Sequence, residues 1–333
     1  MKRRQRGQPS RQRGVALIMV LLAFALATAL AAGMYTSQHL MIYKASHYLD
    51  REQQRSLALG AEALAEHILA QDWKSDKQNN AYVDDYGEDW GKYAAALPVD
   101  NGVVQLQIDD LEGRFNLNDL LTATGQVDPV AKQRFERLLQ VLEITSINVD
   151  KVIDWEDSND TPSGATGAED NYYLGLTPPY RAANRPFTSV TELRLIAGIT
   201  EADYKKLLPN VSALPLTGIG FNVNTATGPV LRSLNQGITQ AQAETILQVR
   251  ADTPFKDITD FLARPEFAGL GLKNQELSVN SHFFRVAIRV TYDDQVYRLV
   301  SVLYRDDQGN LSVVSRDEGQ RALITKKLFS LSQ

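Results

Sequence analysis

The chain of 333 residues contains no cysteine, so it can form no disulfide bond, thiolate metal site or thiol nucleophile. Histidine is also scarce, with four residues, and none of them lies near an acidic segment: His39, His47, His67 and His282. The sequence has no Gly-x-Ser-x-Gly elbow, no His-Glu-x-x-His motif and no phosphate-cradling glycine loop. We therefore expect no enzyme, and a metallohydrolase of the outer cell envelope is the weakest alternative.

Acidic residues are absent from the first 14 positions, which carry six basic residues. The remaining chain has 29 basic and 40 acidic residues, so its net charge is −11, whereas the whole chain has −5. An acidic body of this kind argues against broad contact with the phosphates of nucleic acids.

A run of 21 residues without any charge, positions 15–35, follows the basic segment. About 20 apolar residues in a helix span the hydrocarbon core of a bilayer. The basic flank is expected to remain in the cytoplasm, which places the body of the protein across the membrane.

Three interpretations of this N-terminus compete. A cleaved signal peptide would be cut after small residues near Ala29 or Ala31, although its apolar region is usually only about 7–15 residues long. A signal anchor would not be cut. A pilin-type leader would be cut between Gly14 and Val15, before the apolar helix, and the glycine placed directly ahead of that long helix favours this third interpretation.

The helix is expected to continue beyond the membrane, because residues 36–74 contain no proline and a single glycine, Gly60. Leu57, Ala61, Leu64 and Ile68 recur at helical spacing and mark one apolar face. The sequence thus predicts one long helix that passes from the membrane into the body of the protein. The apolar face would pack either inside the protein's own fold or against partner subunits.

Alternating apolar residues predict strands at both ends of the body. One early strand is expected around Val104 and Ile108, and late strands are expected over 284–290 and 296–304, followed by a turn at 306–310 and a strand over 311–315. We expect these strands to form an antiparallel sheet packed on the long helix, which gives an α+β fold.

Between the early and late strands, the pattern predicts helices, over 130–142, 190–197, 201–208, 228–234, 240–250 and 258–262. Short sequence matches recur inside this stretch. Phe115-Asn116-Leu117-Asn118 resembles Phe221-Asn222-Val223-Asn224, and Gly198-Ile199-Thr200 resembles Gly237-Ile238-Thr239. We interpret the stretch as two helical units of related design.

The second unit has the form of a helix-hairpin-helix, which in DNA-binding proteins brings backbone amides to a phosphate. Its turn is Gln236-Gly237-Ile238-Thr239, so the second glycine of the DNA-binding version is missing. The helix over 240–250 carries one basic and one acidic residue. A packing or partner-binding module is therefore favoured over DNA binding.

An acid-rich loop begins near Asp154. Asp157, Asn159 and Thr161 have the 1-3-5 spacing of an EF-hand loop, and Glu169 lies one position beyond the place of the final EF-hand glutamate. Hard oxygen ligands at this spacing suit Ca²⁺. From the motif alone, a calcium site and a solvated acidic loop are equally good interpretations.

Taken together, the leader, the long helix, the terminal sheet and the helical insertion resemble the minor pseudopilin K (GspK) family of bacterial type II secretion systems. The resemblance covers nearly the whole chain. Pilins resemble one another in a glutamate at the fifth mature position, where this chain has Met19. Subunit K lacks that glutamate, and the resemblance implies a subunit at the tip of the pseudopilus that needs no neighbour above it.

The resemblance implies five segments: a prepilin-type leader (1–14), a transmembrane part of the helix (15–35), a first pilin-like part (36–114), an inserted α-helical domain (115–280, with units of about 115–215 and 219–275) and C-terminal strands (281–333). It implies an inner-membrane, single-pass subunit of a Gram-negative bacterium, with a cytoplasmic N-terminus and a periplasmic body, that is processed and methylated.

The resemblance also implies a function and partners. The chain would take part in the export of folded proteins across the outer membrane, with I- and J-type minor pseudopilins, the major pseudopilin and prepilin peptidase as partners and no nucleic acid. It further implies calcium bound by the acidic loop, for which we name Asp157, Asn159, Thr161, Glu169 and Asp170. A membrane-tethered helix-hairpin-helix DNA-binding protein of the competence type is the alternative function.

Overall fold

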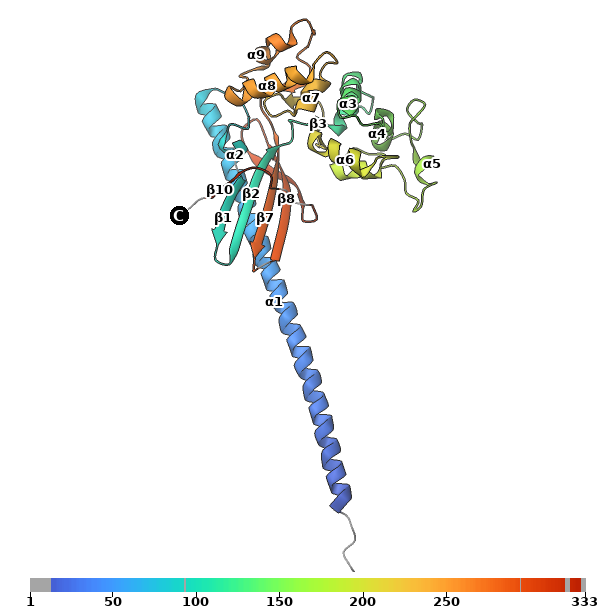
Figure 1. The fold of residues 1–333 in the computed structure, drawn as a ribbon, viewed down its shortest axis with the longest axis vertical. Helices are drawn as coiled ribbons and strands as arrows, with labels where there is room; N and C mark the ends of the chain where they lie inside the picture. The colour runs from blue at the N-terminus through green and yellow to red at the C-terminus, as the bar shows by residue number, and fades with distance from the viewer. Residues whose placement is uncertain (1–12, 93, 294, 321–323, 331–333) are drawn as a thin grey trace, which may run out of the picture. The chain divides into compact units, whose positions relative to one another are not determined.

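The computed structural model describes residues 13–92, 94–293, 295–320 and 324–330 (Figure 1). Most of the predicted leader, residues 1–12, lies outside the described residues. The chain divides into two compact units that meet in the sequence at Ser56 and Leu57, and each unit is described by itself below.

The first unit consists of the N-terminal part of helix α1 (Arg13–Asn79). Its apolar side chains are exposed, and α1 is long and apolar enough to cross a membrane by length and composition. The hydroxyl of Thr28 donates to the carbonyl oxygen of Phe24 (2.6 Å), and that of Thr36 donates to Ala32 (2.9 Å). Polar groups that bond to their own helix in this way are compatible with an apolar environment.

The second unit contains a six-stranded sheet in the order β10-β1-β2-β7-β8-β9 (Figure 1). The strands are β1 (Ala94–Val99), β2 (Gly102–Asp110), β7 (Phe283–Tyr292), β8 (Gln295–Arg305), β9 (Leu311–Asp317) and β10 (Leu328–Ser330). All neighbouring pairs are antiparallel except β1 and β10. The predicted α+β fold with an antiparallel sheet is confirmed, but the expectation of a single early strand is wrong, because β1 and β2 form a hairpin.

The C-terminal part of α1 packs on this sheet through small residues. Ala58, Ala61, Ala65 and Leu69 are buried against apolar side chains of β2, β7 and β8. The predicted face is therefore rotated slightly, since Leu57, Leu64 and Ile68 lie partly buried at its margins. Alanine has a short side chain, so the helix can approach the sheet closely and still exclude water.

Helix α2 (Asp89–Lys92) precedes β1, and a largely helical stretch separates β2 from β7. Its elements, in chain order, are β3 (Phe115–Asn116), η1 (Leu117–Leu120), α3 (Pro129–Val141), α4 (Val149–Glu156), α5 (Asp170–Tyr173), η2 (Val190–Leu195), α6 (Glu201–Leu207), η3 (Leu208–Asn210), β4 (Val211–Ser212), β5 (Phe221–Asn222), α7 (Gly228–Ser233), α8 (Gln240–Asp252), α9 (Ile258–Leu262), η4 (Pro265–Phe267) and β6 (Leu277–Ser278). Each predicted helix is present, the one at 190 as a 3₁₀ helix, and α4 and α5 were not predicted.

The matched sequence motifs adopt the same local structure. β3 and β5 each begin with Phe-Asn, and each pairs in parallel with a two-residue strand, β4 and β6 respectively. Thr200 caps the N-terminus of α6, and Thr239 caps that of α8. The two halves nevertheless share one hydrophobic core, which includes Phe135 and Phe255. The division near residue 217 therefore remains a prediction.

Candidate metal centre

The candidate site begins at the end of helix α4. The side chain of Asn148 caps this helix by accepting a hydrogen bond from the backbone N–H of Lys151 (3.1 Å). Val152 and Ile153 are completely buried in the helical core and fix the orientation of the last turn. This packing directs Asp154, which is also completely buried, into the loop that follows.

The loop after α4 is folded by its own side chains. The Oδ1 atom of Asp157 accepts hydrogen bonds from the backbone N–H of Asn159 (3.0 Å) and from its side-chain amide (2.8 Å). The side chain of Asn159 in turn accepts a hydrogen bond from the backbone N–H of Thr161 (2.8 Å). Short turns of this type are what Asp and Asn favour, and here they hold the loop against the end of α4.

Three buried carboxylates meet at this place. Asp154, Asp157 and Glu169 each offer one oxygen, and these three oxygens lie within 4.8 Å of one another. Glu169 is 3% exposed, and both of its carboxylate oxygens lack a hydrogen-bond partner among the described residues. The Oδ2 atom of Asp154 is equally buried and unpartnered. Buried carboxylate oxygens normally have hydrogen-bond partners, so the unpartnered oxygens here suggest that a ligand binds at this place.

Glycine allows the loop to close over the cluster. The backbone N–H of Ser163 donates to Oδ1 of Asp154 (2.8 Å). A Cβ atom placed on Gly167 would lie 2.2 Å from Oδ2 of Asp154 and 2.7 Å from backbone atoms of Ser163. Any side chain at position 167 would therefore displace the carboxylate or the loop.

Among the residues that the structure describes, no basic side chain forms an ion pair with the carboxylates of the cluster. Burial, followed by repulsion from Asp154 and Asp157, raises the pKa of Glu169 to about 7. Burial also raises the pKa of Asp157. Like charges that are buried together are unfavourable, and a divalent cation would convert them into ligands.

The structure brings together two of the five predicted ligands, Asp157 and Glu169. Asn159 and Thr161 are exposed and take part in the turns of the loop. Asp170 forms an ion pair with Arg181 (2.7 Å) and accepts a hydrogen bond from the backbone N–H of Ala182 (3.0 Å).

Asp154 was not predicted as a ligand, although the sequence holds a signal for it. It lies three residues before Asp157, near the end of a helix, and this spacing places both carboxylates on one side of the chain.

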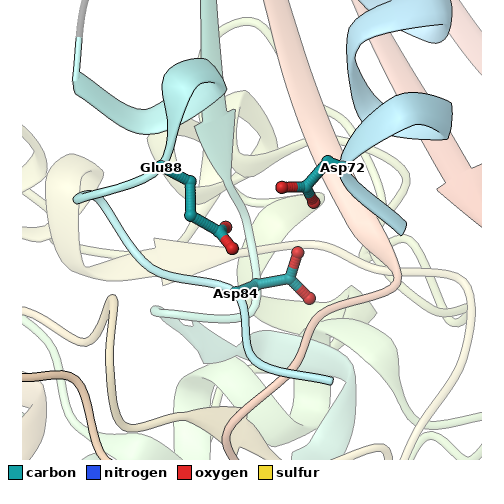
Figure 2. Close-up of side chains that lie close together, drawn as sticks. All are labelled: Asp72, Asp84 and Glu88. Atoms are coloured by element: carbon teal, nitrogen blue, oxygen red, sulfur yellow. The ribbon is translucent and has the colours of Figure 1, made fainter. Parts of the chain in front are cut away.

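A second acidic cluster lies elsewhere in this unit. Figure 2 shows Asp72 from α1 and Asp84 and Glu88 from the segment before α2, with their carboxylates turned toward one another. Here an internal cation is present, because the guanidinium of Arg305 donates to both oxygens of Asp84 (2.6 and 2.5 Å) and to Asp72 (3.1 Å). Glu88 accepts hydrogen bonds from the indole of Trp90 (2.7 Å) and the backbone of Asp85. This cluster is therefore a partnered network, unlike the loop cluster.

One residue of the helix-hairpin-helix turn packs into the helical core. Ile238 is buried, and Thr239 caps α8 with a reciprocal bond to Gln242. Arg250, the basic residue of α8, donates to the carbonyl oxygen of Val223 (2.7 Å). The other three residues of the turn, Gln236, Gly237 and Thr239, are exposed, but α8 presents no basic face for phosphate.

The predicted processing residues stand at the start of α1. Gly14 and Val15 are both exposed, and no heavy atom would lie within 4 Å of a Cβ atom on Gly14. The cleavage itself stays a prediction.

Comparison with known proteins places the chain among secretion proteins. Family models described as "Type II secretion system (T2SS), protein K" match residues 113–216 and 221–280. Type II secretion system protein K of Pseudomonas aeruginosa is 40% identical over 318 residues, which cover 94% of each chain. The protein of the same name from Pectobacterium carotovorum is 32% identical over 327 residues, covering 93% of this chain and 97% of that relative.

A solved structure shares the fold. It is a chain of the GspK-GspI-GspJ complex from the enterotoxigenic Escherichia coli type 2 secretion system, with a TM-score of 0.73 and 24% identity. The match covers 83% of this chain and 99% of that one.

Proposed function

The chain belongs to the family of type II secretion system protein K, and we propose that it is the minor pseudopilin that caps the tip of the periplasmic pseudopilus. The 40% identity with the Pseudomonas aeruginosa protein over 94% of both chains carries this proposal. The family is structural, so we propose no catalytic role. The DNA-binding alternative has no support from these relatives, and the lack of a basic face on α8 also argues against it.

Two features support a place at the tip. Position five of the expected mature chain is Met19, so the helix lacks the carboxylate that would neutralise the terminal amine of a neighbouring subunit. In addition, residues 111–282 form an insertion between β2 and β7 that a stacking subunit would have to accommodate. A subunit with these features ends a fibre more readily than it extends one.

The partners we propose are I- and J-type minor pseudopilins, together with the major pseudopilin and prepilin peptidase. The solved relative that shares the fold was obtained as a GspK-GspI-GspJ complex. In this chain, the part of α1 that belongs to the first unit exposes large apolar side chains before and after residue 40, including Met34 and Met41. Such side chains are suited to lipid and to the helices of other subunits.

We propose a single-pass orientation in the inner membrane with the N-terminus in the cytoplasm. The six basic residues before Val15 support this orientation. Prepilin peptidase would cut after Gly14, and the new N-terminus would be methylated.

We also propose that Ca²⁺ binds between Asp154, Asp157 and Glu169 and stabilises the loop between α4 and α5. The buried, unpartnered oxygens of Asp154 and Glu169 support this assignment. Calcium accepts irregular sets of six to eight oxygens, whereas magnesium demands a near-ideal octahedron, so an irregular loop favours calcium.

Crosslinking in cells tests the tip assignment. A photoreactive residue placed at Met41 or Leu49, both exposed on α1, should form adducts with I- and J-type pseudopilins. The same residue at Lys256, exposed in the helical stretch, serves as the matched control for nonspecific capture. Adducts restricted to copies of this chain would overturn the proposed tip complex.

A further inference from the structure

A polar cavity of about 220 Å³ lies among α3, the end of α7 and the loop before β6. This volume is far above the roughly 10–15 Å³ that one water molecule needs. Its polar lining consists of three basic residues and three amides, namely Arg134, Arg137, Lys273, Gln133, Asn235 and Gln275. Arg134 and Arg137 are one helical turn apart, so both point from the same side of α3.

The two arginines are held in place by protein groups. Arg134 is 7% exposed; its guanidinium pairs with Glu276 (2.7 Å) and donates to the carbonyl oxygen of Gln275 (2.6 Å). Arg137 donates to the carbonyl oxygens of Ser233 (2.8 Å) and Leu234 (2.9 Å). These bonds fix the orientation of both side chains before any ligand binds. A guanidinium group has five N–H donors, so each arginine retains donors for a further acceptor.

Lys273, the third basic residue of the cavity, remains available for a ligand. Lys273 is exposed, and its ammonium makes no hydrogen bond or ion pair within the described part of the chain. The lining of the cavity thus has three basic side chains and no acidic one, although the carboxylates of Glu276, Asp119 and Asp128 act on Arg134 from outside this lining. Burial is the main cause that lowers the pKa of Arg134; the carboxylates of Glu276 and Asp119 oppose this shift, and repulsion from Arg137 adds to it. An anion in the cavity would relieve this repulsion.

We propose that this cavity binds a small oxyanion, a carboxylate or phosphate group, between the guanidinium groups of Arg134 and Arg137 and the ammonium of Lys273. Planar guanidinium groups suit carboxylate and phosphate oxygens, and the lysine closes the open side as a mobile point charge. The site is separate from the proposed calcium loop and shares no residue with it. The group could be a free ion or an acidic side chain of another protein.

Two probes distinguish these sources, both applied to the full chain in nonionic detergent at constant ionic strength. Inorganic phosphate is titrated and followed by ³¹P line broadening. A fluorescein-labelled tetraglutamate peptide is followed by anisotropy, with unlabelled phosphate as competitor. Saturable phosphate binding alone supports a free ion, whereas peptide binding that phosphate displaces supports a protein carboxylate.

Variants at exposed lysines decide whether the binding belongs to this cavity. Lys273→Gln should weaken binding of whichever probe binds by roughly tenfold, the effect of losing one charged hydrogen-bond donor. Lys256→Gln removes the same charge from an exposed position outside the cavity and should change nothing. The proposal is overturned if neither probe binds saturably, or if both variants weaken binding equally.

Discussion

The side-chain amide of Asn118 bonds to both backbone groups of Phe187: its oxygen accepts the N–H (2.7 Å) and its nitrogen donates to the carbonyl (3.0 Å). Asn224 makes the same pair of bonds to Phe255, both at 2.9 Å. Each asparagine is the last residue of a Phe-Asn-x-Asn motif, and all four residues are buried. The motif therefore recurs because each copy fixes a distant phenylalanine and the start of the short helix that follows it.

We expect Asn118→Ala to lower the free energy of unfolding by about 3 kcal/mol, because it leaves the buried N–H and carbonyl of Phe187 without partners. Asn224→Ala should have a similar effect through Phe255. Denaturant unfolding of the full chain in detergent measures both. The exposed Asn274→Ala is the control and should stay within about 0.5 kcal/mol of the wild type. A loss below 1 kcal/mol for both buried asparagines would contradict the role assigned to the motif.

Chelation of calcium should lower the melting temperature of the full chain in detergent. A ligand that binds only the folded state stabilises it by about 2.7 kcal/mol at a hundredfold excess over its dissociation constant. Added Ca²⁺ should restore the melting temperature better than Mg²⁺. Identical melting curves in chelator and in calcium would remove the metal assignment and leave the family assignment intact.

Relative to the wild type, the Glu169→Gln variant should have a lower melting temperature with calcium and a higher one in chelator. With calcium, the loss of one charged ligand weakens the response to the metal. In chelator, the neutral side chain avoids the burial of a charge and the repulsion from Asp154 and Asp157, which together raise the pKa of Glu169, so the variant should melt above the wild type. Asp160→Asn, an exposed acid of the same loop that lies outside the cluster, is the matched control and should change the calcium response less.

Gly167→Ala tests the geometry of the same site without altering charge. Its Cβ atom would meet Asp154, so calcium should stabilise this variant much less than the wild type. An unchanged calcium response would argue that Asp154 is not a ligand.

The second acidic cluster predicts a loss of stability as pH rises. Burial, with repulsion from Asp72 and Asp84, raises the pKa of Glu88 to about 9 in the folded chain, against 4.5 for the ordinary group. The folded state then holds a proton that the unfolded state releases, so the stabilisation is complete below about pH 4.5 and is lost as pH rises toward 9. His282, whose pKa the neighbouring carboxylate of Glu112 (Nδ1 to Oε2, 3.6 Å) raises to about 8, acts in the same direction.

Glu88→Gln should flatten this pH dependence between pH 5 and 9, because glutamine carries no proton to lose and can still accept the bond from Trp90. Denaturant unfolding of the full chain in chelator measures the slope, and Asp100→Asn, in an exposed turn, is the control. A slope that is the same for both variants and the wild type would contradict the proton held by Glu88.

The sequence alone predicted the helices and strands whose apolar residues recur at a regular spacing. Alternation at Val104 and Ile108 predicted β2, and helical spacing predicted α3 and α8. Strand β1 was missed because its residues, Ala94-Ala-Ala-Leu-Pro-Val99, include three alanines and a proline, which are not typical of strands.

Sequence spacing also found part of the candidate site. The 1-3-5 pattern indicated Asp157, since the loop is local in sequence. The network around Arg305 could not be predicted, because Asp72 and Asp84 lie 233 and 221 residues away from it. Such partners meet only when the sheet brings the end of β8 to the end of α1, and no local pattern carries that information.

The decisive test of the proposed pseudopilin is the mass of the mature chain, isolated from the inner membrane of cells that contain prepilin peptidase. We expect a chain that begins at Val15 with one added methyl group, and Gly14→Ala should leave the precursor uncut. A mature chain that begins near Ala31, after the apolar segment, would rule out the proposed pseudopilin, because a subunit without its membrane helix could not assemble through that helix.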